Sequence, residues 1–313
     1  MLIESPRSHA ATVHAPGCIR VADGANGVDL FYRDWGAGKP LLFMSGWTLN
    51  SSMWGYQMEP LAKAGFRCVA YDRRAHGRSS DPGRGYDFDT LADDLAAVIE
   101  ALDLSDVVLV AHSFASGEVV RYLSRHGSRR IAGVVFIAPA AIPFLLKTAD
   151  NPGGIDSAVI EQIQTEQRED FPAWAQAGAD AYFAGAGSTG IVNATLGMMN
   201  QTSHQAMLAL ARLGVTTDFR SELGRIDIPT LLIHGDRDAS APLELTSQPA
   251  HQLIPGSQLT VYSGGPHGLY FTHKANLNED IARFAQASGS SKWTRKSLSR
   301  QADTCAPGAS VDA

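Results

Sequence analysis

The sequence predicts an α/β fold, with a mostly parallel central sheet flanked by helices and a helical cap insertion. Two observations predict it. Short apolar segments typical of buried strands alternate along the chain with segments whose apolar residues recur at helical spacing. The alternation breaks between about residues 146 and 225, where helix-like sequence rich in Ala, Gln and Met follows. An insertion of that size, returning to a strand near residue 230, indicates a cap over one edge of the sheet.

The individual elements follow from these two periodicities. Strands are short apolar runs bounded by turn residues, whereas helices repeat apolar positions every three or four residues, as at 91, 95, 98, 99 and 102. We expect strands at residues 29–35, 41–44, 67–71, 107–111, 133–137, 230–233 and 258–262, and helices at residues 90–102, 115–125 and 275–284.

These elements divide the chain into four parts. The α/β core is expected at residues 20–145 and 223–288, and the cap at residues 146–222. Residues 1–19 and 289–313 are expected to be tails. The C-terminal segment is polar and rich in Ser, Ala and Arg, without a periodic apolar face.

Composition excludes several classes of protein. A net charge of −6 gives no reason to expect nucleic acid or an anionic membrane as a partner. The longest apolar stretch, residues 133–146, is too short to span a bilayer and is interrupted by two prolines. The three cysteines are scattered and no secretory signal precedes the first strand, so we expect a cytoplasmic protein without disulfides or a zinc site.

The candidate nucleophile is Ser113. It lies between an apolar strand and a helical segment, with small residues two positions away on either side, which is the arrangement of a nucleophile elbow. The usual pattern is G-x-S-x-G, because the turn leaves little room beside the serine. Here Ala111 and Ala115 replace both glycines, so the motif needs support from the rest of the chain.

That support comes from two later loops, each at the carboxyl end of a predicted strand. One carries Asp238 and the other carries His267, held between Pro and Gly. A serine becomes a good nucleophile only when a base removes its proton and a third group orients the base. The order Ser113, Asp238, His267 is that of an α/β-hydrolase triad.

Other residues could fill these roles. Asp236 is the alternative acid, but the first carboxylate of such a loop more often bonds within its own turn, so Asp238 is favoured. His251, His273 and His112 are alternative bases, and we expect all three to pack rather than to react.

An acyl-transfer site also needs amide donors for the developing oxyanion. We expect them to be the backbone N–H groups of Trp47 and Phe114. Aromatic side chains of the cap and of the loops beside it are expected to wall a substrate pocket: Trp47, Phe144, Trp174 and Phe183. No P-loop, H-E-x-x-H motif or clustered set of metal ligands is present in the sequence, so neither a cofactor nor a metal is expected.

With these residues in hand, the chain resembles the α/β-hydrolase superfamily, in particular its cofactor-free haloperoxidase, arylesterase and perhydrolase branch. The resemblance covers roughly residues 23–287. Its motifs are those at residues 31–36, 45–47, 53–54, 71–79, 113, 117–119, 121–122, 234–238, 266–268, 272–273 and 277–280.

The resemblance implies that Ser113 is the nucleophile, His267 the base and Asp238 its orienting acid. It also implies hydrolysis of small carboxylic esters and lactones, and a peracid-forming side activity without metal or haem. This chain departs from the family at five positions. Ser45 stands where the family has His, and Ala75, Ala111, Ala115 and Ser116 stand where it has Gly. We expect the added groups at the elbow to narrow the space near the nucleophile.

The leading hypothesis is therefore a serine hydrolase that cleaves a small or medium ester or lactone through an acyl-enzyme. A perhydrolase or haloperoxidase-type activity, or an amidase or lactamase activity, on the same triad is the alternative within the enzyme class. A ligand receptor of this fold with little turnover is the alternative from another class. The sequence leaves open the acyl group, the leaving group and the oligomeric state.

Overall fold

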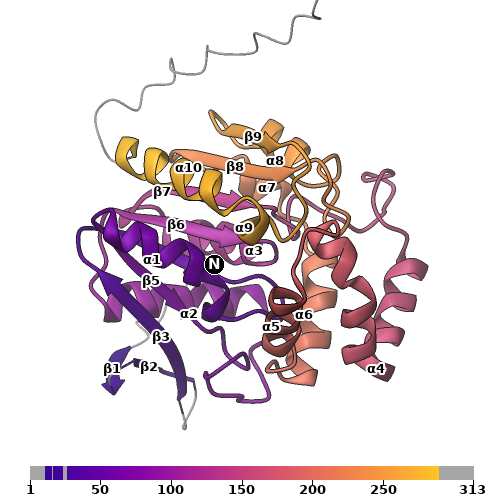
Figure 1. The fold of residues 1–313 in the computed structure, drawn as a ribbon, viewed down its shortest axis with the longest axis horizontal. Helices are drawn as coiled ribbons and strands as arrows, with labels where there is room; N and C mark the ends of the chain where they lie inside the picture. The colour runs from indigo at the N-terminus through magenta and orange to yellow at the C-terminus, as the bar shows by residue number, and fades with distance from the viewer. Residues whose placement is uncertain (1–10, 16, 24–26, 289–313) are drawn as a thin grey trace, which may run out of the picture.

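A mostly parallel sheet forms the centre of the molecule (Figure 1). The computed structural model describes residues 11–15, 17–23 and 27–288, and within them nine strands form one sheet in the order β1-β2-β3-β5-β4-β6-β7-β8-β9. The pairs from β1 to β5 are antiparallel, and the pairs from β5 to β9 are parallel. The strands are β1 (Thr12–Ala15), β2 (Cys18–Val21), β3 (Val28–Gly36), β4 (Lys39–Met44), β5 (Phe66–Tyr71), β6 (Val107–His112), β7 (Ile131–Ile137), β8 (Thr230–Gly235) and β9 (Gln258–Tyr262).

The seven strands expected from the sequence are all present, and the α/β fold class is confirmed. The N-terminal boundary was wrong, because residues 12–15 and 18–21 form β1 and β2 rather than a tail. The physical reason is a short alternation: Ile19 and Val21 are buried in the core, while Cys18 and Arg20, which alternate with them, are partly exposed. The expected C-terminal tail, residues 289–313, lies outside the described residues.

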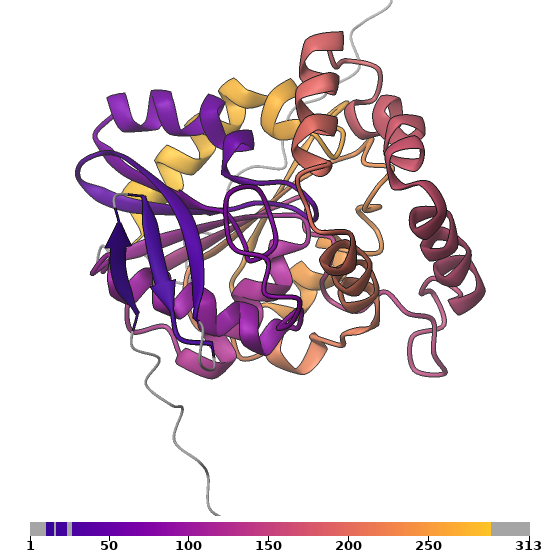
Figure 2. The same ribbon diagram turned by 90° about the horizontal axis from the view of Figure 1, so that it is seen from below.

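Helices cover both faces of the sheet (Figure 2). The central strands are buried on both sides, so alternate residues pack into different layers. Leu42 and Met44 of β4 belong to one buried cluster, whereas Leu41 and Phe43 belong to another, on the opposite face of the strand. The helices are η1 (Ser51–Trp54), α1 (Gly55–Lys63), α2 (Phe88–Ala101), α3 (Ala115–His126), α4 (Ser157–Phe183), α5 (Thr189–Met199), α6 (His204–Thr216), α7 (Arg220–Leu223), α8 (Ser247–Leu253), α9 (Leu269–Thr272) and α10 (Lys274–Ala287). The three helices expected from the sequence correspond to α2, α3 and α10.

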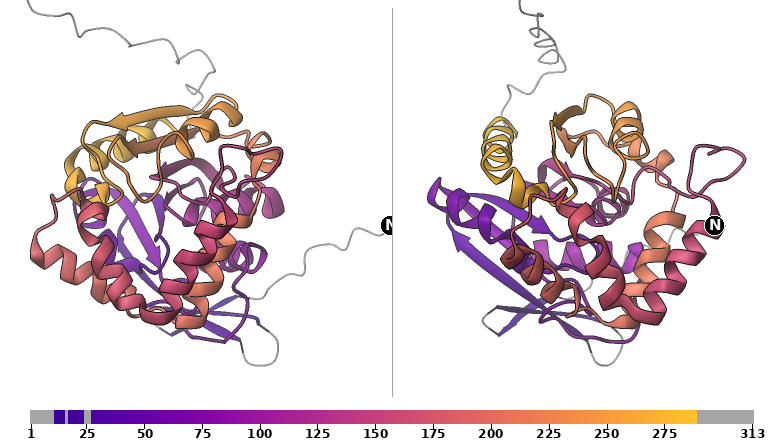
Figure 3. Two further views of the ribbon diagram at one scale, coloured as in Figure 1. Left: turned by 90° about the vertical axis from the view of Figure 1, so that its right-hand side faces the viewer. Right: turned by 45° about the vertical axis from the view of Figure 1, so that its right-hand side comes forward.

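The cap-like insertion expected from the sequence is present between β7 and β8. It consists of α4, α5 and α6, which gather on the side of the molecule toward which β6 and β7 point (Figures 1 and 3). Helix α4 is kinked at Asp170, whose φ and ψ are −153° and 81°. Pro172 cannot donate a helical hydrogen bond, and the Asp170 carboxylate caps the second half of α4 by accepting from Ala173 N at 3.0 Å. The exact cap limits of 146 and 222 stay a prediction.

No helix in the described part of the chain has both the length and the apolar character needed to cross a membrane.

The loops after β8 and β9 approach each other closely at the edge of the sheet where the candidate site lies. A Cβ at Gly235 would lie 1.9 Å from the carbonyl oxygen of Gly265, so only glycine fits at the end of β8. Because the first loop carries Asp238 and the second carries His267, this backbone contact sets their separation.

We predict that Gly235→Ala destabilises the fold by about 1–3 kcal/mol or more, because a methyl group would overlap a rigid backbone carbonyl. Gly178→Ala is the matched control, since Gly178 is an exposed residue inside α4 with open space where a Cβ would stand. It should gain up to about 1 kcal/mol from the better helix propensity of Ala. Urea denaturation measures both changes, and an unchanged midpoint for Gly235→Ala would contradict the prediction.

Candidate active site

Ser113 occupies a sharp turn between β6 and α3. Its φ is 56°, in the left-handed region that non-glycine residues rarely adopt. Hydrogen bonds on both sides hold it there: Ser113 N donates to Ile137 O at 2.9 Å, and Ser113 O accepts from Ala140 N at 3.2 Å. The turn therefore has the geometry of the nucleophile elbow that the sequence predicts.

The residues that replace glycine beside Ser113 are all completely buried. Ala111 and Ala115 are fully buried, and their methyl groups are part of the core on one face of the sheet. The Ser116 hydroxyl donates to Ser113 O at 2.7 Å and accepts from Ala141 N at 3.4 Å. The Ser116 hydroxyl thus bonds the backbone of the turn, and the expectation that the added groups narrow the space near the nucleophile stays a prediction.

A continuous chain of hydrogen bonds joins the three residues expected to form the triad. His267 Nε2 lies 2.9 Å from Ser113 Oγ, and His267 Nδ1 lies 2.7 Å from Asp238 Oδ2. All three side chains are at least nine-tenths buried. The carboxylate fixes the imidazole tautomer that leaves Nε2 free to accept the serine proton.

Asp238 is held by more than the base. Its other oxygen, Oδ1, accepts from the amides of Ser240 at 2.9 Å and Ala241 at 2.8 Å. His234, at the end of β8, adds a contact from Nε2 to Asp238 Oδ2 at 3.2 Å. Burial alone would raise the pKa of Asp238, but the charges and hydrogen bonds of His267 and His234 hold the pKa well below its ordinary value. Asp238 is therefore an acceptor-only carboxylate at neutral pH.

The contact from His234 was not anticipated from the sequence. The signal was available, because His234 precedes Asp238 by four residues in the same strand-end loop. Its other ring nitrogen, Nδ1, lies 2.7 Å from Ser247 Oγ, which fixes the orientation of the ring.

The competing acid and bases have other bonds. Asp236 Oδ1 accepts a backbone amide of the loop that carries His267, at 2.6 Å. His251 bonds the Ser257 hydroxyl at 2.8 Å, and His273 stacks on Tyr262 with ring centroids 5.6 Å apart. None of the three touches Ser113 in the described structure.

His112 packs, as expected, but it also touches the backbone of the base. It is fully buried, and its Nε2 donates to the carbonyl oxygen of His267 at 3.1 Å. Burial, reinforced by the neighbouring charge of His267, lowers the pKa of His112 to about 3. His112 is therefore neutral whenever the protein is folded near neutral pH.

The amides expected to form the oxyanion hole lie on two separate segments. Phe114 N–H opens α3, and Trp47 N–H lies in the loop after β4. Among the described residues neither amide has a protein acceptor. A Cβ at Gly46 would lie 2.6 Å from His112 Nδ1 and 3.2 Å from Ser113 Cβ, so the loop passes directly beside the nucleophile.

The residues expected to wall the pocket lie in different places. Trp47 and Trp174 belong to one aromatic cluster, with ring centroids 5.7 Å apart. Phe144 instead lies under the Arg220 guanidinium, 5.0 Å from the centroid of the Phe144 ring. Phe183 is 1% exposed and packs against the triad loop. Their roles toward a substrate stay predictions.

The cap is bonded directly to the loop that carries the base. Gly268 N donates to Tyr182 O at 2.9 Å, and the Tyr182 ring lies edge-on to His267 with centroids 5.2 Å apart. A Cβ at Gly268 would lie 2.5 Å from the Phe183 ring. The end of α4 therefore supports the base from the cap side.

The described residues contain no group of three or more His, Cys, Asp or Glu side chains that could hold a metal ion.

Comparison with known proteins decides the family. A family model described as the α/β-hydrolase fold matches residues 39–274. The chain belongs to the α/β-hydrolase fold family. It is 40% identical over 273 residues to a putative non-heme chloroperoxidase of Synechocystis, covering 83% of this chain and 95% of that one.

Two further relatives place this α/β hydrolase in the haloperoxidase, esterase and perhydrolase group. It is 35% identical over 274 residues to a bifunctional esterase/perhydrolase of Acinetobacter calcoaceticus, covering 84% of this chain and 98% of that one. The crystal structure of a bromoperoxidase from Bacillus anthracis superposes with a TM-score of 0.80 at 37% identity, covering 84% of this chain and 97% of that one. The branch that the sequence motifs indicate is confirmed.

We predict that acid destabilises the fold, because histidines that are buried and neutral in the folded state bind protons when the chain unfolds. His76, like His112, is fully buried, and burial lowers its pKa to about 3, against about 6.5 in an unfolded chain. Between these values the unfolded state binds protons that the folded state does not. The contribution of each neutral histidine to the free energy of unfolding is therefore fully present above about pH 6.5. Below that pH it falls by about 1.4 kcal/mol per pH unit for each histidine.

His76→Asn tests this prediction, because an amide N–H can replace the bond that His76 Nδ1 donates to Arg74 O at 2.8 Å. Urea denaturation between pH 6 and pH 5 should show a slope smaller by about 1.4 kcal/mol per pH unit. The exposed His204 gives the control, His204→Asn, which should leave the slope unchanged. A wild-type slope in His76→Asn would contradict the prediction.

Proposed function

We propose that this protein is a serine hydrolase that cleaves small to medium carboxylic esters or lactones through an acyl-enzyme on Ser113. The observation that carries the proposal is the hydrogen-bonded chain from Ser113 Oγ through His267 to Asp238, with distances of 2.9 and 2.7 Å. The two amides of Trp47 and Phe114, which have no acceptor among the described residues, support the same chemistry.

In the acylation step Ser113 Oγ attacks the ester carbonyl carbon while His267 Nε2 takes the hydroxyl proton. Asp238 stabilises the imidazolium that forms, and the amides of Trp47 and Phe114 bind the oxyanion. The tetrahedral intermediate then collapses, and His267 returns the proton to the leaving alcohol oxygen. A lactone keeps its alcohol on the acyl chain.

In the deacylation step a water molecule replaces the alcohol. His267 Nε2 removes a proton from the water as its oxygen attacks the acyl carbon, and the same amides bind the second oxyanion. Collapse of this intermediate breaks the bond to Ser113 Oγ, releases the carboxylic acid and returns the proton to the serine.

The surroundings of Trp47 favour an apolar acyl group. Its ring packs edge-on against Phe171 and Trp174, each with centroids 5.7 Å away, and Met207 of α6 completes the cluster. Trp47 Nε1–H donates to Met207 O at 2.9 Å, which leaves the ring no free polar group. We take Trp47 and Trp174 as walls of the acyl pocket.

A peracid-forming activity is the second candidate. It is supported by the similarity to a bifunctional esterase/perhydrolase and to proteins named as non-heme chloroperoxidases. Hydrogen peroxide would replace water in the deacylation step, and the product would be a peracid. Peracid formation from a short carboxylic acid and peroxide, measured beside ester hydrolysis, tests this candidate.

We predict that Ser113→Ala abolishes turnover of a chromogenic short-chain ester, and that Asp238→Asn lowers kcat by about 10⁴-fold, because the neutral amide favours the wrong imidazole tautomer. Asp236→Asn is the matched control. Its carboxylate lies in the same loop but bonds a backbone amide, so kcat should stay close to that of the wild type.

Full activity of the Ser113→Ala protein would contradict the proposal. A wild-type protein that binds esters but turns them over at no measurable rate would instead favour a receptor of this fold.

A further inference from the structure

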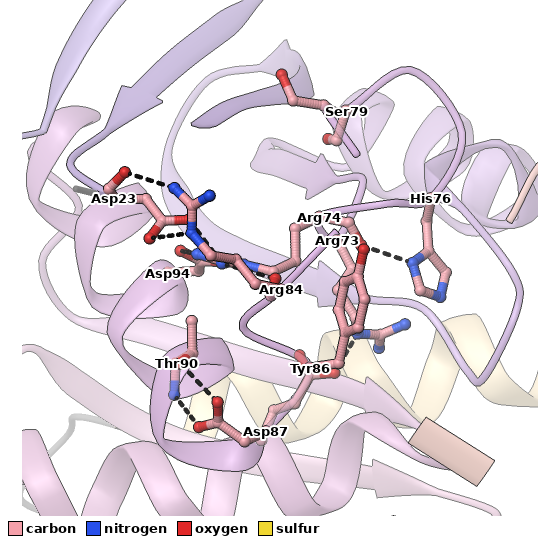
Figure 4. Close-up of polar contacts among 12 residues, drawn as sticks. Asp23, Arg73, Arg74, His76, Ser79, Arg84, Tyr86, Asp87, Thr90 and Asp94 are labelled. Carbon is pink, nitrogen blue, oxygen red and sulfur yellow. Dashed lines mark hydrogen bonds and ion pairs between the residues drawn. The ribbon is translucent and has the colours of Figure 1, made fainter. Parts of the chain in front are cut away.

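Two consecutive arginines follow β5, and their side chains leave the chain in different directions (Figure 4). Arg74 bonds Asp94 of α2 at 2.7 Å, and Asp23 at 3.2 Å. Arg73 is directed at the loop after β4. Both guanidinium groups are almost completely buried, with side-chain exposures of 4% for Arg73 and 2% for Arg74.

Arg73 contacts three groups at once. Its Nε donates to Glu118 Oε1 at 2.5 Å, and the Glu118 side chain is only 1% exposed. One terminal nitrogen, Nη2, donates to Ser45 O at 2.7 Å, and the other, Nη1, makes a longer contact of 3.4 Å with Gly46 O. The rigid fork of a guanidinium makes this combination possible.

These contacts connect the two segments that carry the oxyanion donors. Ser45 and Gly46 immediately precede Trp47, and Glu118 lies on α3, the helix that Phe114 opens. The Arg73 guanidinium also lies over the Phe114 ring, with Cζ 5.1 Å from its centroid. One buried side chain therefore touches both halves of the oxyanion hole.

The geometry of the peptide between Gly46 and Trp47 relates these contacts to the direction of the Trp47 N–H. The carbonyl of Gly46 and the N–H of Trp47 belong to one planar trans peptide, in which C=O and N–H point in opposite directions. The Gly46 carbonyl accepts from Leu49 N at 3.2 Å and contacts Arg73 Nη1 at 3.4 Å, so the Trp47 N–H of the same peptide points away from the guanidinium. The positive charge on the carbonyl side also polarises the peptide and strengthens its N–H as a donor.

We propose that Arg73 is a positioning residue of the oxyanion hole, which orients the Trp47 N–H through the carbonyls of Ser45 and Gly46 while Glu118 holds the guanidinium. The inference deepens the proposed function and rests on it. It assigns Arg73 no contact with substrate.

The test is Arg73→Lys, which keeps a positive charge beside Glu118 but loses the fork to the loop carbonyls. Since removal of one oxyanion donor lowers kcat by about 10²–10³-fold, misdirection of one should lower it by about 10–100-fold, with KM within about threefold. A boronic acid that forms a tetrahedral adduct on Ser113 should lose affinity by a similar factor, because the adduct uses the same amides. If Arg73 only stabilised the fold, Arg73→Lys would change neither the ratio of kcat to KM nor the affinity for the boronate.

Arg74→Lys is the matched control for the loss of a buried ion pair. It should lower the melting temperature about as much as Arg73→Lys does, while kcat and boronate affinity stay within about twofold of wild type. An Arg73→Lys protein with wild-type kcat and boronate affinity overturns the inference, and so does an equal loss of both in Arg74→Lys.

Glu118→Gln is the second variant if Arg73→Lys does not fold. It preserves side-chain volume but removes the negative charge that holds the guanidinium, so kcat should fall by about 3–30-fold. An unchanged kcat overturns the inference. A wild-type protein that neither turns over esters nor binds the boronate overturns both the proposed function and the inference. If the wild type does both and Arg73→Lys equals it, the inference alone is wrong.

Discussion

The left-handed backbone at Ser113 is the constraint on which the candidate site depends. A serine at a φ of 56° is strained, and such conformations persist only where the surrounding structure over-determines them. Here the end of β7, the start of α3 and the Ser116 hydroxyl all bond the backbone of the turn. The strained turn is thus held by a neighbouring strand and by the helix that follows it.

The buried charged groups of this region form ion pairs. Arg73 pairs with Glu118, Arg74 pairs with Asp94, and Asp238 contacts two histidines, and all of these side chains are almost completely buried. Burying an ion pair gives little net stability, because desolvation offsets much of the attraction. What such pairs provide is fixed direction, since each carboxylate has only one geometry that satisfies its partner. The site is therefore built from groups that cannot reorient independently.

The fold was largely predictable from sequence because the strands in a parallel sheet are buried on both faces and leave continuous apolar runs. The triad was predictable because each member follows such a run. The first two strands were not, since only Ile19 and Val21 mark β2 and the signal is too short to separate from a tail. The role of Arg73 depends on contacts between distant segments, and the position of the Phe144 ring depends on Arg220, far along the chain. Local pattern carries no information about such pairs.

The bond between Gly268 and Tyr182 has a consequence for how such a protein can diversify. His267 is supported partly by the cap, because the last turn of α4 packs on His267 and leaves no room for a side chain at Gly268. A cap transplanted from a relative would bring its own aromatic residues and a different seat for this loop. The cap and the loop after β9 are therefore coupled, and exchange of the whole insertion would also change the contacts that hold His267.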